Sequence, residues 1–323
     1  MQTLPTGGHR PFIRSALTTS NIMFCVLLAL LPSAGVGIYY YGLRAALVMG
    51  LAVASAVLAE LFFALAARRR ITAGDYSAAV TGLMVGLILP PGVPWYFPVL
   101  ASVCAIVPVK MAFGGIGCNL FNPAMAGKLV LLLLFRTQMQ DYSQGTHSAL
   151  TPLTQLANGN TIDVQAMLFG DCAGPIGTGS ALAIGAGACF LMAVGVLDLL
   201  IPAGYLAVFV LLMSLFGGHG ADPAYLIAQV MGGGLLFTAF FMATDYTTSP
   251  VTIRGRVLYG AALGALTAAF RLGGAGDNAV VPALLLGNAL VPLIDRYAMP
   301  RPFGTKRRIR TVREGRGKIG SNA

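Results

Sequence analysis

Long apolar runs follow one another along almost the whole chain, and they constrain the fold more than any other feature of the sequence. A helix that crosses a bilayer needs about 20 mostly apolar residues. We place about ten such runs, some of them short, at 21–41, 45–67, 77–91, 95–113, 123–136, 177–198, 200–217, 225–243, 257–271 and 279–295. Only 10% of the residues are charged, against about a quarter in a soluble domain. The sequence therefore predicts an all-α integral membrane protein.

The basic residues predict the orientation, because Lys and Arg accumulate on the cytoplasmic side of membrane proteins. If the N-terminus is inside and the runs alternate, most of the 21 basic residues fall inside, with the densest groups at 68–70 and 296–318. We therefore expect a multi-pass protein of the bacterial inner membrane with both termini in the cytoplasm. The same distribution accounts for the net charge of +10, so we expect no nucleic-acid binding.

The runs group into two units of five helices. The third run of each unit contains Gly and ends at a Pro, which is typical of broken or half helices around a site. Because five crossings leave the chain on the opposite side of the membrane, the second unit begins there and is inverted relative to the first. The predicted organisation is a cytoplasmic N-terminal segment (1–20), a first five-helix repeat (21–136), a periplasmic loop (137–176), a second five-helix repeat (177–295) and a basic cytoplasmic tail (296–323).

Two polar loops that alternation places on the inner face are candidates for a ligand site. The first, at 113–128, is rich in Gly and contains Asn119 and Asn122, whose amides both donate and accept hydrogen bonds. The second, at 242–252, combines Asp245 with a cluster of Thr residues beside a span, and acids in such places are functional candidates. A connector in which Asn122 only caps the next helix is an equally good interpretation of the first loop.

Two charges lie within predicted spans. Glu60 and Lys128 are costly there unless they are paired or face water. We expect them to pair with each other between helices, with an ion route as the alternative. The five cysteines show no C-x-x-C spacing and the three histidines are scattered, so we expect no metal site, and no catalytic residue is assigned.

The two polar loops and the end of the last span carry a family resemblance. Residues 110–125, KMAFGGIGCNLFNPAM, resemble the signature K-x-x-x-GG-[IL]-G-x-N-x-FNPA-[ML] of the RnfD/NqrB family. Residues 242–250, MATDYTTSP, resemble its second signature, although Tyr246 stands where the family usually has Pro. Residues 288–304, NALVPLIDRYAMPRPFG, resemble its last helix. The resemblance covers residues 10 to 305 and is strongest to the RnfD branch.

The resemblance implies two flavins. The family joins flavin mononucleotide (FMN) to a threonine through a phosphoester, in a signature that Ser148-Ala-Leu-Thr-Pro-Leu matches at Ser148 and Thr151. The two residues between them depart from the usual pair. Because the loop that carries Thr151 is the longest, we expect it to be accessible from the periplasm. A second, noncovalent flavin (riboflavin) is expected at Asn119, Asn122 and Asp245.

The resemblance further implies a subunit, inactive alone, of a membrane complex that moves electrons between reduced ferredoxin and NAD⁺ and couples this to Na⁺ or H⁺ translocation. Its flavins would relay the electrons. The implied partners are the bilayer, a second covalent-flavin subunit, iron–sulfur membrane subunits, and soluble iron–sulfur and flavin subunits. One alternative is the NqrB subunit of the Na⁺-pumping NADH:quinone oxidoreductase, which normally has a longer N-terminal region. Another is a urea-type small-solute channel or transporter, because such proteins also use a five-plus-five architecture.

Overall fold

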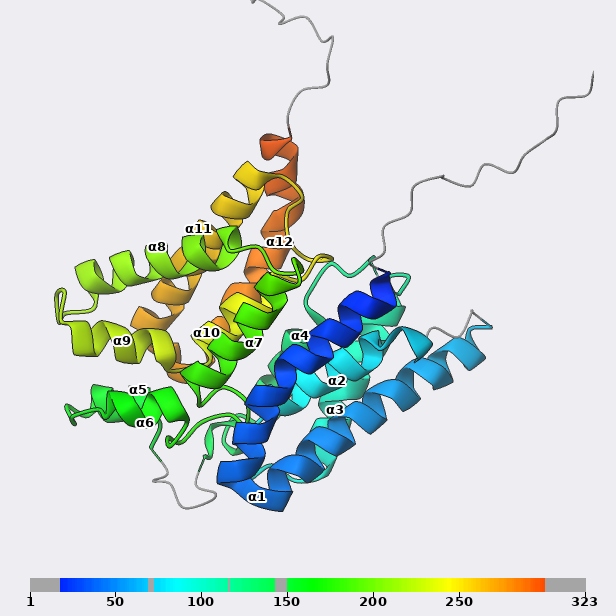
Figure 1. Ribbon diagram of the computed structural model, residues 1–323, viewed down its shortest axis with the longest axis horizontal. Coiled ribbons are helices and arrows are strands. Elements are labelled where there is room, and N and C mark those ends of the chain that lie inside the picture. Colours follow the sequence, from blue (N-terminus) through cyan, green and yellow to red (C-terminus); the bar gives the residue numbers. More distant parts are fainter. Residues whose placement is uncertain (1–17, 69–72, 116, 143–149, 300–323) are drawn as a thin grey trace, which may run out of the picture.

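The computed structural model describes residues 18–68, 73–115, 117–142 and 150–299, and within these ranges the secondary structure is helical without a strand. The first element, α1, runs from Thr19 to Ala66 and begins where the Thr18 side chain caps it. Gly42 breaks it with a φ of +65°, a conformation that Gly adopts without strain. The two halves fold back on each other in Figure 1 and coincide with the predicted runs 21–41 and 45–67.

The remaining helices lie at the positions that hydropathy predicts. They are α2 (Ser77–Ile88), α3 (Tyr96–Cys104) with its π-helical continuation η2 (Ala105–Met111), α4 (Pro123–Leu134), α7 (Ala181–Ala193), α8 (Leu200–Phe216), α9 (Pro223–Met231), α10 (Leu235–Phe237) continued by η4 (Thr238–Met242), α11 (Ile253–Phe270) continued by η5 (Arg271–Ala275), and α12 (Val280–Ala298). Shorter helices lie between them: η1 (Ala73–Asp75), η3 (Gln138–Gln140), α5 (Pro152–Ala157), α6 (Val164–Phe169) and η6 (Gly276–Asn278). The predicted loop 137–176 thus contains short helices.

Length and composition make several of these helices suitable for a bilayer. Among the described residues, α1, α11 with its continuation to Asn278, and α12 are long and apolar enough to cross one, and α9 with α10–η4 qualifies if the bent pair is one span. This pair bends by 59° at its break, which lies inside the predicted eighth run. The other apolar helices are shorter. The count of ten crossings, the inverted repeat and the orientation stay predictions.

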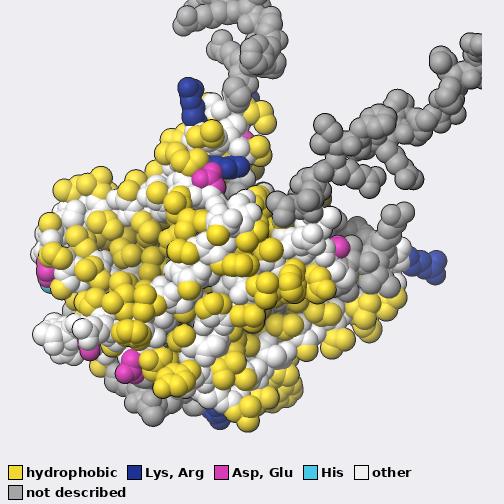
Figure 2. Space-filling view, in the orientation of Figure 1, with side chains coloured by type: hydrophobic (Ala, Val, Ile, Leu, Met, Phe, Trp, Pro, Cys, Tyr) yellow, Lys and Arg dark blue, Asp and Glu magenta, His cyan; other side chains and the backbone are white. Residues whose placement is uncertain are grey.

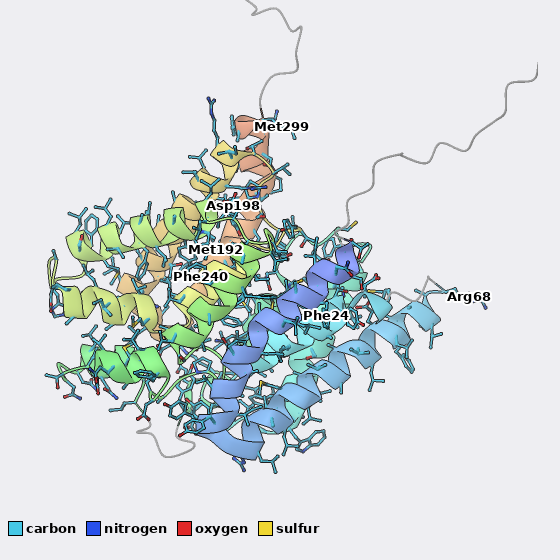
Figure 3. All side chains as sticks on the ribbon, in the orientation of Figure 1. Phe24, Arg68, Met192, Asp198, Phe240 and Met299 are labelled. Atoms are coloured by element: carbon cyan, nitrogen blue, oxygen red, sulfur yellow. The ribbon has the colours of Figure 1, made fainter. Side chains whose placement is uncertain are left out.

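The surface is apolar, as lipid contact requires. Figure 2 shows hydrophobic side chains over most of the visible face, with the charged ones mainly near its edges. Several large apolar side chains are mostly exposed, among them Leu43 and Phe62 in α1 and Leu133 in α4, at 76%, 78% and 75%. In Figure 3, Arg68 projects from the end of α1 away from the bundle. A water-soluble monomer does not expose apolar surface on this scale.

The helices form two groups in Figure 1, with α1–α4 in one and α8, α9, α11 and α12 in the other. The most extensive packing within the groups joins α1 to α2 and α8 to α11. The groups meet where α7 packs on α1 and where α4 packs on α12. Helix α10 contacts both α9 and α7, so the broken helix lies beside this junction.

Small residues bring α8 and α11 close together. A Cβ at Gly260 would lie 2.6 Å from the carbonyl oxygen of Ile201, and one at Gly264 would lie 2.5 Å from that of Tyr205. The two glycines are four residues apart and therefore share one face of α11. This Gly-x-x-x-Gly spacing permits close backbone contact between helices in a membrane.

We expect Gly264→Ala to destabilise the folded protein by about 1–3 kcal/mol, because the added methyl group separates α11 from α8. The matched control is Gly185→Ala in α7, where an added Cβ has no atom within 4 Å and should have no such effect. Chemical denaturation of both variants in detergent measures the difference. Equal stabilities would show that the α8–α11 contact is not tight.

The structure corrects the prediction that Glu60 pairs with Lys128. The Lys110 ammonium lies 2.6 Å from Glu60 Oε2, and both side chains are buried. Lys128 is buried in α4 and forms no hydrogen bond or ion pair with any described residue. The prediction was wrong because α1 is apolar all round, so its sequence does not indicate which helix faces Glu60.

Candidate functional site

The two polar loops predicted to lie on one face come together. Asn122 Oδ1 accepts a hydrogen bond of 3.2 Å from the backbone N–H of Met125 and so caps α4, with Pro123 in the first turn, where its missing N–H is no loss. The Asn122 amide nitrogen donates to the carbonyl oxygen of Met242 at 3.4 Å. Asn122 is therefore both a helix cap and a direct link between the loops.

The second loop is held in shape by its own polar side chains. Asp245 Oδ2 accepts a 2.8 Å hydrogen bond from the Thr247 hydroxyl, and the Thr244 hydroxyl donates to the carbonyl oxygen of Phe240 at 2.6 Å. The Tyr246 hydroxyl donates to the carbonyl oxygen of Val196. Burial raises the pKa of Asp245, and the hydrogen bonds from Thr247 oppose this rise. The Tyr that replaces the usual Pro thus anchors the loop to the segment before α8.

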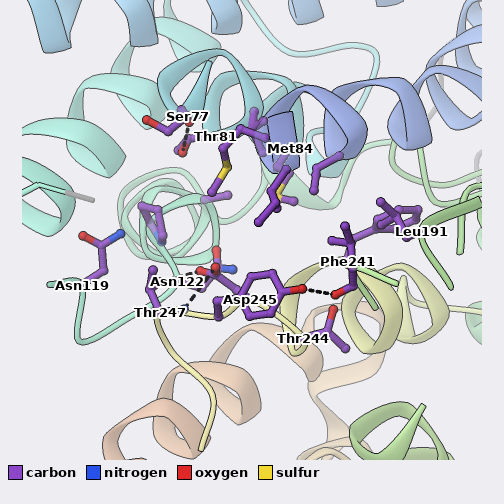
Figure 4. Close-up of a pocket in the computed structure, with 18 of the residues that line it drawn as sticks. Ser77, Thr81, Met84, Asn119, Asn122, Leu191, Phe241, Thr244, Asp245 and Thr247 are labelled. Carbon is purple, nitrogen blue, oxygen red and sulfur yellow. Dashed lines mark hydrogen bonds between the residues drawn. The ribbon is translucent and has the colours of Figure 1, made fainter. Parts of the chain in front are cut away.

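A pocket lies between the loops. Its polar residues include Asn119, Asn122 and Asp245, and its apolar walls come from α1, α2, α7 and η4. Figure 4 shows Asn122, Asp245 and Thr247 close together, with Met84, Leu191 and Phe241 around them. The space between its walls is about 820 Å³, including the open mouth. A largely apolar cleft with a few polar groups is typical of a small-molecule site.

One residue that lines this pocket has a side-chain oxygen without a partner in the described part of the chain. Asn119 Oδ1 is buried and accepts no hydrogen bond from any described residue. A buried acceptor without a donor is unfavourable by about 1–3 kcal/mol. Asn119 lines the pocket, so a ligand with an N–H or O–H group would satisfy this oxygen once the side chain turns toward the cavity. Asn119 is therefore a lining residue whose hydrogen-bonding capacity is not used by the described residues.

Sequence reasoning did not assign Lys110 and Ser77 to this site. Both line the pocket, and the Lys110 ammonium donates to Ser77 Oγ at 2.6 Å in addition to its contact with Glu60. Lys110 belongs to the family signature, so a signal was present in the sequence. No signal identified Ser77, because a Ser at the start of an apolar helix resembles an ordinary cap.

Thr151 lies in a second, separate environment. It is the N-cap of α5, and its side chain is only 3% exposed. The Thr151 hydroxyl donates to Asp277 Oδ2 at 2.6 Å and lies 2.9 Å from the Thr154 hydroxyl. Thr151 itself is thus buried within the loop that was expected to be accessible, because α5 packs on the turn between α11 and α12. Ser148, the other predicted residue of this signature, lies outside the described residues.

Nothing in the sequence identified Asp277 as the partner of Thr151. The Asp277 carboxyl accepts the hydrogen bond from Thr151, and the positive charges of Arg271 and Lys128 also act on it. An acid in a short turn normally remains hydrated. Here the turn is covered by α5, so the carboxyl takes the hydroxyl of Thr151 as its partner.

The broken helix connects the two environments. Its break, at Gly232–Gly234, lies beside Asp277, because Gly232, Gly233 and Asp277 line one small cavity next to α5. Its other end, at Met242, contacts Asn122 in the pocket between the loops. One half-helix, Leu235–Met242, therefore extends from the surroundings of Thr151 to the surroundings of Asn119, Asn122 and Asp245.

Comparison with known proteins gives the family. Residues 7–304 match the sequence profile of the NQR2, RnfD, RnfE family. The chain belongs to this family. Together with the apolar helices, this membership makes it a multi-pass membrane protein.

Three relatives illustrate the similarity within the family, and each is the D subunit of its complex. The one from the Na(+)-translocating ferredoxin:NAD(+) oxidoreductase complex of Acetobacterium woodii is 36% identical over 93% of this chain and 95% of its own length. The one from the proton-translocating ferredoxin:NAD(+) oxidoreductase complex of Clostridium ljungdahlii is 34% identical over 94% of this chain and 97% of its own length. The one from the ion-translocating oxidoreductase complex of Shewanella amazonensis is 35% identical over 91% of this chain and 96% of its own length. The predicted resemblance to the RnfD branch is thus confirmed.

Proposed function

We propose that this chain is a flavin-carrying membrane subunit of an ion-translocating electron transport complex that links ferredoxin to NAD⁺. The observation that carries the proposal is the pocket between the two signature loops, which Asn122 joins through Met242 and which Asn119, Asn122 and Asp245 line. The names of the relatives support it, since two of them are subunits of ferredoxin:NAD(+) oxidoreductase complexes. One of those complexes is named for Na⁺ and the other for protons, so the proposal covers either ion.

The residues of the pocket fit a noncovalent flavin, for which riboflavin is the proposed form. The broad apolar walls suit a flat ring system, and the polar groups offer complementary hydrogen bonds. Asn119 Oδ1 would accept from a ring N–H or a ribityl hydroxyl, and the Asp245 loop would hold the hydroxyl-bearing end. A flavin supplies one- and two-electron transfer, while the protein sets its position and surroundings.

Thr151 is the proposed attachment point of the covalent FMN. Its hydroxyl is the group that forms the phosphoester, and its place at the start of α5 fixes where the attached group begins. The half-helix Leu235–Met242 lies between this region and the pocket. This arrangement supports two flavins at separate places in one subunit of a larger complex.

Asn119→Ala tests the noncovalent site. We expect it to weaken flavin retention about tenfold, because one hydrogen bond of about 1.4 kcal/mol to the ligand is lost. The stability of the flavin-free protein should not fall, because the variant removes an acceptor that has no partner among the described residues. Acid extraction and chromatography of the purified full chain measure and identify the released flavin.

The matched control is Asn278→Ala. Asn278 Oδ1 is also buried without a partner among the described residues, but Asn278 does not line the pocket. This variant should retain flavin as the wild type does. Equal retention in wild type and Asn119→Ala would exclude Asn119 from the binding site, and a wild-type protein that retains no noncovalent flavin would exclude the site itself.

A further inference from the structure

A buried ion pair forms part of the pocket wall. Lys110 and Glu60 are 2% and 0% exposed, and the Lys110 ammonium lies 2.6 Å from both Glu60 Oε2 and Ser77 Oγ. An ammonium has three N–H donors, and these two contacts use two of them. No further acceptor for Lys110 occurs among the residues that the structure describes.

The pair is arranged asymmetrically with respect to the pocket. Lys110 lines it, whereas Glu60 does not. The cavity is therefore in contact with the positive member, and the negative member lies behind it in α1. The other charged residue in the lining is Asp245, whose carboxyl is occupied by the Thr247 hydroxyl.

Stability alone does not explain such a pair. The desolvation of two buried charges offsets most or all of their attraction, and an apolar pair of similar volume is often as stable. A charge in a low-dielectric wall acts strongly on its neighbours, since two unit charges a few ångströms apart interact by several kcal/mol at an effective dielectric constant of about 20. The pair is thus well placed to act on the ligand.

We propose that Lys110 stabilises negative charge on the ligand of this pocket and that Glu60 and Ser77 hold its ammonium in position and moderate its charge. This inference rests on the proposed function, because the ligand is then an isoalloxazine ring, which becomes more negative on reduction. Lys110 raises the reduction potential of the noncovalent flavin, and Glu60 lowers it. Both are residues that tune the bound group, and neither reacts.

The two members of the pair give opposite expected results. Lys110→Gln removes the positive charge and should make reduction about tenfold less favourable, which is about 59 mV per one-electron step. Glu60→Gln removes the negative charge behind Lys110 and should make reduction more favourable by a similar factor. Lys110→Arg keeps the charge and should restore most of the wild-type value.

The experiment is a potentiometric titration of the purified full chain, followed by flavin absorbance. Thr151→Val is used as the common background, so that the absorbance reports the noncovalent flavin alone. Lys128→Gln is the matched control, because Lys128 is also a buried lysine but does not line the pocket. It should leave the potential of this flavin nearly unchanged.

Opposite shifts in Lys110→Gln and Glu60→Gln support the proposal. Bound flavin with an unchanged potential in both variants, or shifts of the same sign, would show that the pair only stabilises the fold. If Lys110→Gln does not accumulate, Glu60→Gln alone decides, since a purely structural pair predicts no rise in potential. A wild-type protein without noncovalent flavin overturns the proposed function itself, and this role of Lys110 with it.

Discussion

Replacing Thr151 by valine is expected to abolish the covalent flavin attachment that we propose at this residue. Valine has nearly the shape of threonine but has no hydroxyl oxygen that could form a phosphoester. The full chain, produced together with a flavin transferase, should give a fluorescent band in a denaturing gel under ultraviolet light. The Thr151→Val variant should give none, and a mass spectrum of the peptide that contains Thr151 should show the unmodified mass.

Two matched variants make this experiment specific. Thr154→Val removes the hydroxyl that lies 2.9 Å from that of Thr151 and should leave the band in place. Thr151→Ser keeps a hydroxyl at the same position and should retain part of the fluorescence. A band that persists in Thr151→Val, or a wild type that stays dark although the transferase is present, would contradict covalent attachment at this residue.

The surroundings of Thr151 add a structural consequence to this prediction. Its hydroxyl donates to Asp277, and its side chain is almost entirely buried under α5. An esterified oxygen has no proton to donate, so this hydrogen bond exists only in the unmodified protein. We therefore expect α5 to separate from η6 before the flavin is attached, and Asp277 to find a different partner afterwards.

Local properties of the chain predicted much of the fold. Hydropathy located the helices, and the interruption near Gly42 appeared as a gap between two apolar runs. Alternation of the runs placed the Asn119/Asn122 loop and the Asp245 loop on one face, and the structure joins them through Asn122 and Met242. The helix positions depend on residues that are close in sequence, and the side of each loop depends on counting the runs before it. A single sequence is enough to predict features of these two kinds.

Pairwise contacts between distant residues were not predictable in the same way. Glu60 pairs with Lys110 and not Lys128 because of how the helices rotate about their axes, and a helix that is apolar all round does not indicate this rotation. The contact of Thr151 with Asp277 joins residues 126 positions apart. Arg271, the last residue of the predicted run 257–271, is buried against the broken helix. These outcomes depend on tertiary packing, which hydropathy does not contain.

Arg271 holds the broken helix together. It lies 8% exposed, with its guanidinium donating to the carbonyl oxygens of Gln229 and Gly232 and to the side-chain oxygen of Gln229. The guanidinium also lies over the ring of Phe209, 5.0 Å from its centre. The last carbonyl groups of a helix have no hydrogen-bond donors within that helix. At the end of α9, the guanidinium of Arg271 donates to these carbonyl groups.

Arg271→Met is therefore expected to destabilise the protein by about 2–6 kcal/mol, because two buried carbonyl groups lose their donor at about 1–3 kcal/mol each. Methionine fills much of the same volume, so the effect reports lost hydrogen bonds more than a cavity. Arg271→Lys keeps some of the donors and should lose less. The control is Arg256→Met, which removes the exposed ion pair with Asp198 and should cost less than about 1 kcal/mol.

Chemical denaturation in detergent measures these differences, and the flavin content of the same samples extends the result to the proposed sites. Because the break beside Asp277 and the pocket beside Met242 lie at the two ends of one half-helix, loosening the break in Arg271→Met should reduce flavin at both sites. Arg256→Met should reduce neither. If Arg271→Met is no less stable than Arg256→Met, the guanidinium does not hold the break, and the half-helix owes its position to apolar packing alone.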